Sequence, residues 1–82
     1  GDSTLVSQAY NDIAMAYMEF REYEQALYYI ENSLQISRSQ NYLKSISLTL
    51  NNYGLVFLYL ENYEKASEVF NEALMLKENL ER

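Results

Sequence analysis

Apolar residues recur at helical spacing along the whole chain. Val6, Tyr10, Ile13, Tyr17 and Phe20 follow one another at intervals of four and three residues, which places them on one face of an α-helix. The same spacing returns in three further sets: Tyr23, Leu27, Ile30 and Leu34; Ile46, Leu50, Tyr53, Phe57 and Leu60; and Tyr63, Ala66, Phe70 and Leu74. The pattern predicts four amphipathic helices and therefore an all-α fold.

The second half of the chain repeats the first half after forty residues. The hexapeptide "REYEQA" at residues 21–26 reappears as "ENYEKA" at residues 61–66. Asn11 aligns with Asn51, Ala14 with Gly54 and Ala26 with Ala66, so the size of the side chain is kept. We therefore predict one domain, residues 1–82, made of two repeats at residues 3–40 and 41–82.

Each repeat is predicted to be a tight antiparallel helical hairpin. Only Arg21-Glu22 and Glu61-Asn62 separate the helices of a pair, and so short a connection leaves no other arrangement. Ser3 is a candidate start for the first helix, and Asn41 is a candidate N-cap for the third helix.

Small residues mark the places where helices approach closely, because a larger side chain would hold the two axes apart. The predicted contact positions are Ala14, Ala26, Ser33, Gly54, Ala66 and Ala73. Tyr23 and Tyr63 follow the turns directly, and we expect each ring to cover the end of its hairpin.

This order of large, small and aromatic residues resembles the tetratricopeptide repeat. The matching positions are Tyr10, Ile13, Ala14, Tyr17, Tyr23, Ala26, Ile30 and Ser33, then Leu50, Tyr53, Gly54, Phe57, Tyr63, Ala66, Phe70 and Ala73. The period of forty exceeds the usual length of about 34, as in kinesin-light-chain-type and bacterial signalling repeat proteins. We expect the extra residues, around "RSQNYLKS", to lengthen the second and third helices. Arg21 and Glu61 replace the glycine common in the hairpin turn, and proline is absent.

The resemblance implies a peptide-binding concave face formed by the first helix of each repeat. Mapped onto this chain, the face contains Gln8, Asn11, Met15, Met18, Glu19, Leu48, Asn51, Asn52, Leu55 and Tyr59. Met15, Leu48 and Leu55 are equally consistent with packing between the repeats. The asparagines and Tyr59 are better candidates for contact with a peptide, since asparagine offers both donors and acceptors. Some members grip a peptide's terminal carboxylate with basic residues, but Asn11 and Met15 occupy the basic positions here, and we do not expect that activity.

The composition argues against most other classes of function. The chain has no cysteine and no histidine, which removes disulfides, the usual zinc ligands and the commonest near-neutral general base. The carboxylates of Glu19, Glu22, Glu24 and Glu31 are interpreted as solvated surface groups. We therefore predict no enzymatic activity, no cofactor and no metal. A net charge of −6 with scattered lysines and arginines argues against nucleic acid and anionic membranes as partners. No run approaches the roughly 18 apolar residues of a membrane span, and we expect a cytoplasmic protein.

These observations predict a non-enzymatic module that binds proteins or peptides. Because the first residue is glycine, we expect a fragment of a larger regulatory or scaffolding protein. The alternative is a self-association module that pairs through uncapped ends of the repeat stack. Leu74, Met75 and Leu76 are consecutive and span an arc of about 200° on a helix, and Leu5 and Val6 add apolar surface to the first helix. The predicted self-association residues are Val69, Leu74, Met75, Leu76 and Leu80.

Overall fold

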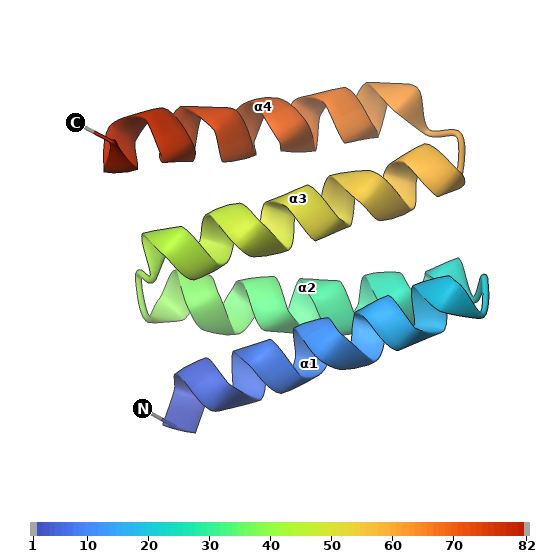
Figure 1. Cartoon of the computed structure of the whole chain (residues 1–82), viewed down its shortest axis with the longest axis horizontal. Coiled ribbons are helices and arrows are strands. Elements are labelled where there is room, and N and C mark those ends of the chain that lie inside the picture. The colour runs from blue at the N-terminus through green and yellow to red at the C-terminus, as the bar shows by residue number, and fades with distance from the viewer. Residues whose placement is uncertain (1, 82) are drawn as a thin grey trace.

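The chain forms a stack of four antiparallel α-helices (Figure 1). The computed structural model describes residues 2–81, so Gly1 and Arg82, the two ends of the predicted domain, lie outside the described residues. The helices are α1 (Asp2–Glu19), α2 (Tyr23–Ser39), α3 (Leu43–Tyr59) and α4 (Tyr63–Leu80). They form a slab of 34 × 29 × 16 Å in which α1 and α4 occupy the two ends of the stack. The all-α fold of two helical hairpins is confirmed.

Three turns of the same geometry join the helices. In each turn the middle residue adopts a left-handed backbone conformation, with φ of 62° at Arg21, 55° at Asn41 and 61° at Glu61. The N–H of Glu22 donates to the carbonyl of Tyr17 at 2.9 Å, and the other two turns repeat this bond. This is the Schellman arrangement, which satisfies carbonyl groups at a helix C-terminus and usually carries glycine at the left-handed position.

The capping residues differ from those predicted. Asn41 does not cap α3, because it occupies the left-handed position after α2, and the N-cap of α3 is Tyr42 without a side-chain capping bond. Helix α1 begins at Asp2, so Ser3 lies inside its first turn. The capping side chain belongs to Asn62, whose Oδ1 accepts a hydrogen bond of 3.3 Å from the N–H of Lys65.

The extra residues of the long repeat are helical, as predicted. Arg38 and Ser39 form the end of α2, and residues 43–45 form the start of α3. Only residues 40–42 leave the helical conformation. The long period therefore extends two neighbouring helices and leaves the turn between them as short as the other two.

Helix α3 is the centre of the core because it packs on α2 through one side and on α4 through the other. Val56 joins Ala14, Ala26 and Ile30 in one buried cluster. The opposite side of α3 contributes to a second cluster made of Leu34, Ile46, Leu50, Phe57, Ala66, Val69 and Ala73. All six small residues predicted at helix contacts are buried.

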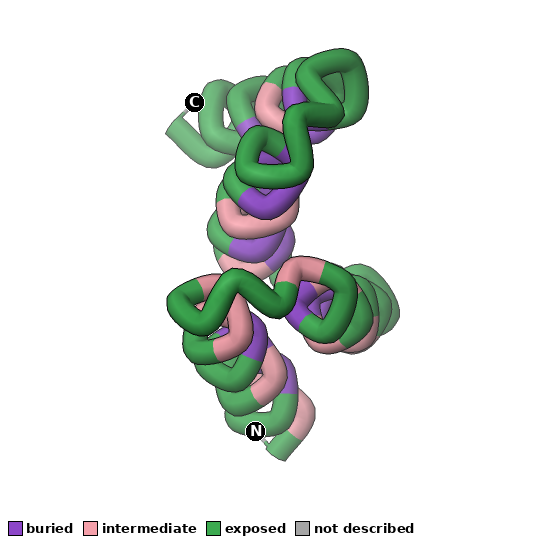
Figure 2. The backbone as a smooth tube through the Cα atoms, turned by 90° about the vertical axis from the view of Figure 1, so that its right-hand side faces the viewer, coloured by how far each residue is buried: buried purple, intermediate pink, exposed green. Residues whose placement is uncertain are grey.

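The predicted core face of α1 is wrong for three of its five residues, whereas Tyr10 and Tyr17 pack against Tyr29 of α2. Val6, Ile13 and Phe20 are 43%, 39% and 77% exposed, whereas the buried residues of α1 are Ser7, Asn11 and Ala14. The small and polar side packs on α2, and no helix among the described residues lies beyond α1 at that end of the stack (Figure 2). Apolar periodicity identified the helix correctly, but it selected a side that has no neighbour here.

The two tyrosines after the hairpin turns have different environments. Tyr23 stacks on Tyr59 of the next repeat, with ring centroids 5.6 Å apart and planes 8° from parallel. Tyr63, the equivalent residue of the second repeat, is 63% exposed. The prediction that both rings cover a hairpin end is therefore wrong for Tyr63, because the helix that would supply its stacking partner is not among α1–α4.

Candidate functional site: a polar hollow on the concave side

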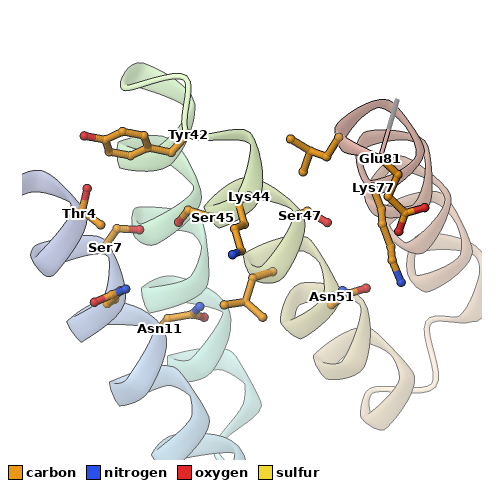
Figure 3. A pocket seen from close by; sticks show the side chains of 13 residues that line it. Thr4, Ser7, Asn11, Tyr42, Lys44, Ser45, Ser47, Asn51, Lys77 and Glu81 are labelled. Atoms are coloured by element: carbon orange, nitrogen blue, oxygen red, sulfur yellow. The ribbon is translucent and has the colours of Figure 1, made fainter.

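A hollow of about 920 Å³ opens between α1, α3 and the last turns of α4 (Figure 3). Both repeats contribute its walls. Helix α1 supplies Gln8 and Asn11, and α3 supplies Leu48 and Asn51. Its other lining residues are Thr4, Ser7, Tyr42, Lys44, Ser45, Ser47, Lys77, Leu80 and Glu81. A ligand in this space would contact the two repeats at once.

The floor of the hollow is a network of serine hydroxyls between α1, α2 and α3. The Oγ of Ser7 lies 2.8 Å from the Oγ of Ser33 and 2.8 Å from that of Ser37. The Ser33 hydroxyl donates to the carbonyl of Ser7 at 2.9 Å, and Ser37 continues the chain to Ser45 at 2.8 Å. Among the described residues, no buried side-chain polar atom is left without a partner. A fully satisfied network holds its helices in one register, whereas an incomplete one would be costly.

Asn11 and Asn52 stabilise the contact between the two repeats. The Nδ2 of Asn52 donates to the Oδ1 of Asn11 at 3.1 Å. Asn11 is only 8% exposed, and its own Nδ2 lies 3.5 Å from the Oγ1 of the fully buried Thr49. These two asparagines, predicted as candidate peptide contacts, therefore take part in the packing between the repeats. Asn51 is exposed and is the asparagine available to a ligand.

Two lysines, one from α3 and one from α4, line this hollow in a chain that is otherwise acidic. Lys44 in the first turn of α3 and Lys77 near the end of α4 both line it, together with the single carboxylate of Glu81. In the view of Figure 3, Ser47 and Asn51 lie between the two lysines. Among residues 2–81, neither lysine takes part in a salt bridge. An acidic group would find two unpaired cations beside hydroxyl and amide groups.

A second, smaller hollow of about 240 Å³ follows the first along α1 and α3. Its lining consists of Met15, Met18, Glu19, Leu55 and Tyr59. The two hollows together include every residue predicted for the concave face except Asn52. The structure therefore gathers the predicted residues on one surface, which is polar at one end and formed by methionine, leucine and tyrosine at the other.

Several lining residues of the larger hollow were not predicted. Tyr42, Lys44, Lys77 and Glu81 enter the hollow from the α2–α3 turn and from α4, outside the first helices that the resemblance marks. Ser33 and Ser37, which bond the lining residues Ser7 and Ser45, offered a usable signal, because two serines one helical turn apart beside the apolar Ile30 and Leu34 indicate a buried polar contact. The lysines offered none, since their position depends on how α4 crosses α3.

The residues predicted for self-association do not form one surface. Val69 is buried in the core, and Leu76 packs against it, so Val69 is unavailable to a second chain. Leu74, Met75 and Leu80 are 54%, 65% and 46% exposed. At 100° per residue they lie about 100–140° apart around α4, and Leu80 belongs to the wall of the larger hollow. No continuous apolar face unites the three.

Tyr53 links the two repeats on the side of α3 that faces α2. Its hydroxyl donates to the Oε2 of Glu31 at 2.8 Å. Burial and the adjacent Glu31 carboxylate, which accepts this bond and repels the phenolate, raise the pKa of Tyr53 to about 12. The ring of Tyr29 on α2 stacks on the ring of Tyr17 on α1, with centroids 5.5 Å apart. Repulsion from Tyr17, followed by burial, raises the pKa of Tyr29.

Within residues 2–81, no three carboxylates gather closely enough to hold a metal ion. In the same part of the chain, no helix combines the length and the apolar character needed to cross a membrane.

The fold is that of a helical-repeat protein built from two stacked helical hairpins. A sequence model described as tetratricopeptide repeat matches residues 5–79. The chain belongs to the tetratricopeptide repeat family, whose members generally act as protein–protein interaction modules. The predicted family is confirmed, and the long, kinesin-light-chain-like period is compatible with it. The same comparisons found no match among curated proteins or solved structures.

Proposed function

We propose that the chain binds an extended peptide segment of a partner protein in the concave groove formed by the two hollows. The observation that carries the proposal is the shared wall of the larger hollow, to which both repeats contribute exposed polar groups. Gln8 and Asn51 supply amides that can pair with a peptide backbone. Leu48 supplies apolar contact between them, and a piece of a regulatory or scaffolding protein would use such a groove to hold its partner.

The lysines favour a peptide with an acidic side chain near the α4 end of the groove. Lys44 and Lys77 line the larger hollow with one carboxylate, that of Glu81, and charge complementarity with an acidic peptide would select partners and speed their association. Because both lysines are at the surface, salt should weaken this part of the interaction. The methionine and leucine side chains of the smaller hollow would accept an apolar residue of the same peptide.

The proposal is tested with peptides selected from a random displayed library on the immobilised protein. A selected peptide is titrated against isotope-labelled protein, and we expect its largest chemical-shift changes at Gln8, Leu48 and Asn51. Asn51→Ala should weaken binding by up to about tenfold, the value of one net hydrogen bond, without changing the melting temperature. Gln35→Ala, an exposed amide on α2, is the matched control. Shift changes confined to α2 and α4 would place the binding site outside the groove.

Asn52→Ala is expected to behave differently from Asn51→Ala. Removal of the Asn52 amide leaves the buried Asn11 without its partner, and an unsatisfied buried polar group destabilises a fold. We therefore expect a lower melting temperature for Asn52→Ala, so a loss of binding in that variant would not identify a contact residue.

Self-association through α4 is the second candidate function of the chain, and it is tested by measurements in solution. The exposed Leu74 and Met75 support it, although they point in different directions. Light scattering over a concentration series measures the mass directly. A dimer converted to a monomer by Met75→Glu would establish this function, and a monomer of about 9.7 kDa throughout the series would exclude it.

A further inference from the structure

The outward face of α1 is an exposed apolar surface. We define it by six residues on the side away from α2: Leu5, Val6, Ala9, Ile13, Ala16 and Phe20. All six are exposed, and helical spacing places them on an arc of about 100°. Only Asp2, at the start of the helix, shares that arc. Exposed apolar surface this continuous usually marks an interaction site.

The forty-residue repeat shows what this surface is built to contact. Ala9 and Ala16 correspond to Thr49 and Val56 of α3, and both of these are fully buried. Ile13 corresponds to Tyr53, which bonds Glu31 of α2. The outward face of α1 therefore has the same place in its repeat as the side of α3 that packs on α2.

The sizes of the side chains also suit a helix. Ala9 and Ala16 are two turns apart and leave a shallow channel, with Val6, Ile13 and Phe20 beside it. Close packing of two helices needs small residues at the contact and larger ones beside it. The helix that packs on α3 presents Tyr23, Leu27, Ile30 and Leu34, and the same pattern would fill the channel on α1.

We propose that the outward face of α1 receives the second helix of a further helical hairpin placed ahead of α1, with the apolar pattern of α2. The short turn between α2 and α3 shows that such a hairpin needs only three connecting residues. This inference goes beyond the proposed peptide binding, because it concerns the other side of α1. A hairpin in this position would lengthen the concave groove by one repeat.

A second copy of this chain is a poor occupant. The side of α2 that would fit is already covered by α3, and the exposed side of α4 carries Glu64, Glu68 and Glu78. Helix α1 has Asp2, Asp12 and Glu19 and no basic residue. Pairing α1 with α4 of a second copy, or with a second α1, would bring carboxylates together, and like charges across an interface disfavour it.

The test is a fusion in which residues 1–42 are joined to residue 3 of the complete chain, so that a copy of α2 precedes α1 in the register of the α2–α3 contact. We expect one cooperative transition at a melting temperature at least about 5 °C above that of the unfused chain. The matched control appends residues 43–82 after residue 82 and has the same length. The melting temperature of this control should rise less, because α4 has Ser67 and Asn71 at the positions where α2 has Leu27 and Glu31.

A lysine at Ala16 distinguishes a docking contact from added length. In the unfused protein Ala16→Lys should leave the melting temperature unchanged. In the fusion, Ala16→Lys in the complete chain, and not in the added residues 1–42, should cancel the rise in melting temperature. Two separate transitions, or a transition at the unfused temperature, would overturn the proposal. A dimer of the unfused protein that Ala16→Lys dissociates would also overturn it, by showing that a second copy covers the face.

A peptide measurement keeps the proposal testable if the fusion does not fold. A synthetic peptide of residues 21–42 is titrated against the isotope-labelled protein. We expect chemical-shift changes at Ala9, Ile13 and Ala16 that Ala16→Lys removes. Shift changes confined to the concave groove, or none at millimolar peptide, would show that the outward face of α1 does not receive this helix.

Discussion

Helices α1 and α3 are the first helices of two repeats of one sequence pattern, but only α3 is enclosed. Val6 is 43% exposed, whereas its equivalent Ile46 is 4% exposed. Ala16 is exposed, whereas its equivalent Val56 is fully buried. The difference arises from neighbours: α3 lies between α2 and α4, and α1 has only α2 as a full neighbour (Figure 1). The repeat pattern therefore encodes a helix with two packing sides, and the position in the stack decides how many are used.

The two repeats also differ where both are buried, and there the differences compensate. Ala14 packs in a cluster with Ile30, whereas Gly54 lies against the ring of Phe70. At these two positions the first repeat has alanine and isoleucine, whereas the second repeat has glycine and the larger phenylalanine. Cores tolerate such exchanges when total volume is kept. The two hairpins therefore keep the same space between their helices, although different side chains fill it.

A buried lysine should show the largest difference between α1 and α3. Val56→Lys places a charge with no partner in the core, and we expect it to lower the free energy of unfolding by about 3–5 kcal/mol. Ala16→Lys, at the equivalent exposed position, should change it by less than about 0.5 kcal/mol. Urea denaturation followed by circular dichroism measures both values. Equal losses in the two variants would show that α1 is enclosed in solution.

The close-contact alanines should respond alike in both repeats. Ala26 and Ala66 are 0% and 1% exposed, so a larger side chain has no space at either position. Ala26→Leu and Ala66→Leu should each cost about 1–3 kcal/mol through overpacking. Thermal melts give the comparison, with the exposed Glu24→Gln as control. A melt unchanged in either variant would contradict the packing described for that hairpin.

Alanine usually stabilises a helix relative to glycine, but the contact with Phe70 should make Gly54→Ala destabilising. A Cβ at Gly54 would lie 2.7 Å from the Cε1 of Phe70. Overpacking costs about 1–3 kcal/mol, which exceeds the gain of about 1 kcal/mol for alanine over glycine in a helix. We therefore expect Gly54→Ala to destabilise the protein by about 1 kcal/mol.

The first repeat supplies the control for this prediction, because Ala14 is accommodated beside Ile30. In a Phe70→Ile background, Gly54→Ala should become stabilising by up to about 1 kcal/mol. A double-mutant cycle from urea denaturation measures the coupling. Additive effects of the two substitutions would show that the ring and the new methyl group do not interfere.

The hairpins and their close contacts were predictable from the sequence because local spacing determines them. Ala14, Ala26 and Gly54 recur in register, and a helix of known length with a short turn can fold back in only one way. The core side of α1 was not predictable in this manner. Val6, Ile13 and Phe20 carry the apolar signal of a packing side, and the sequence of α1 does not show whether a neighbour is present.

The candidate site divides in the same way. The α1 and α3 residues of the site follow from the family resemblance, which implies that the first helices of the repeats share one surface. Helix periodicity then places Gln8, Leu48 and Asn51 on that surface. Lys44 and Lys77 line the same hollow only because α4 crosses α3 at a particular angle, which side-chain packing sets. The bond between Asn11 and Asn52 depends on the register of α1 against α3, and no short-range pattern records that register.

The turns offer a smaller comparison among three sites of one geometry. Arg21 and Glu61 adopt a left-handed conformation that costs a side-chain-bearing residue about 1–2 kcal/mol. Glycine removes that cost but adds freedom to the unfolded chain, so we expect Arg21→Gly and Glu61→Gly to stabilise the protein by about 0.5–1 kcal/mol each. Asn41→Gly should gain less, because asparagine tolerates this conformation. Equal gains at all three positions in thermal melts would contradict this explanation.

The smallest effect is expected at alkaline pH, and it concerns a bond that α3 makes and α1 cannot. Tyr53 bonds Glu31 across the repeat contact, whereas the equivalent Ile13 has no hydroxyl. The pKa of Tyr53 is raised from 10.0 to about 12 by burial and by the Glu31 carboxylate. Because the folded pKa is the higher one, this contribution to stability is fully present below about pH 10 and is lost as the pH rises toward 12.

We expect Tyr53→Phe to flatten the decrease in the free energy of unfolding above pH 10, measured by urea denaturation. Tyr63→Phe, at an exposed ring, serves as the control. The same alkaline slope in Tyr53→Phe and the unchanged protein would show that this hydroxyl does not stabilise the contact between the repeats.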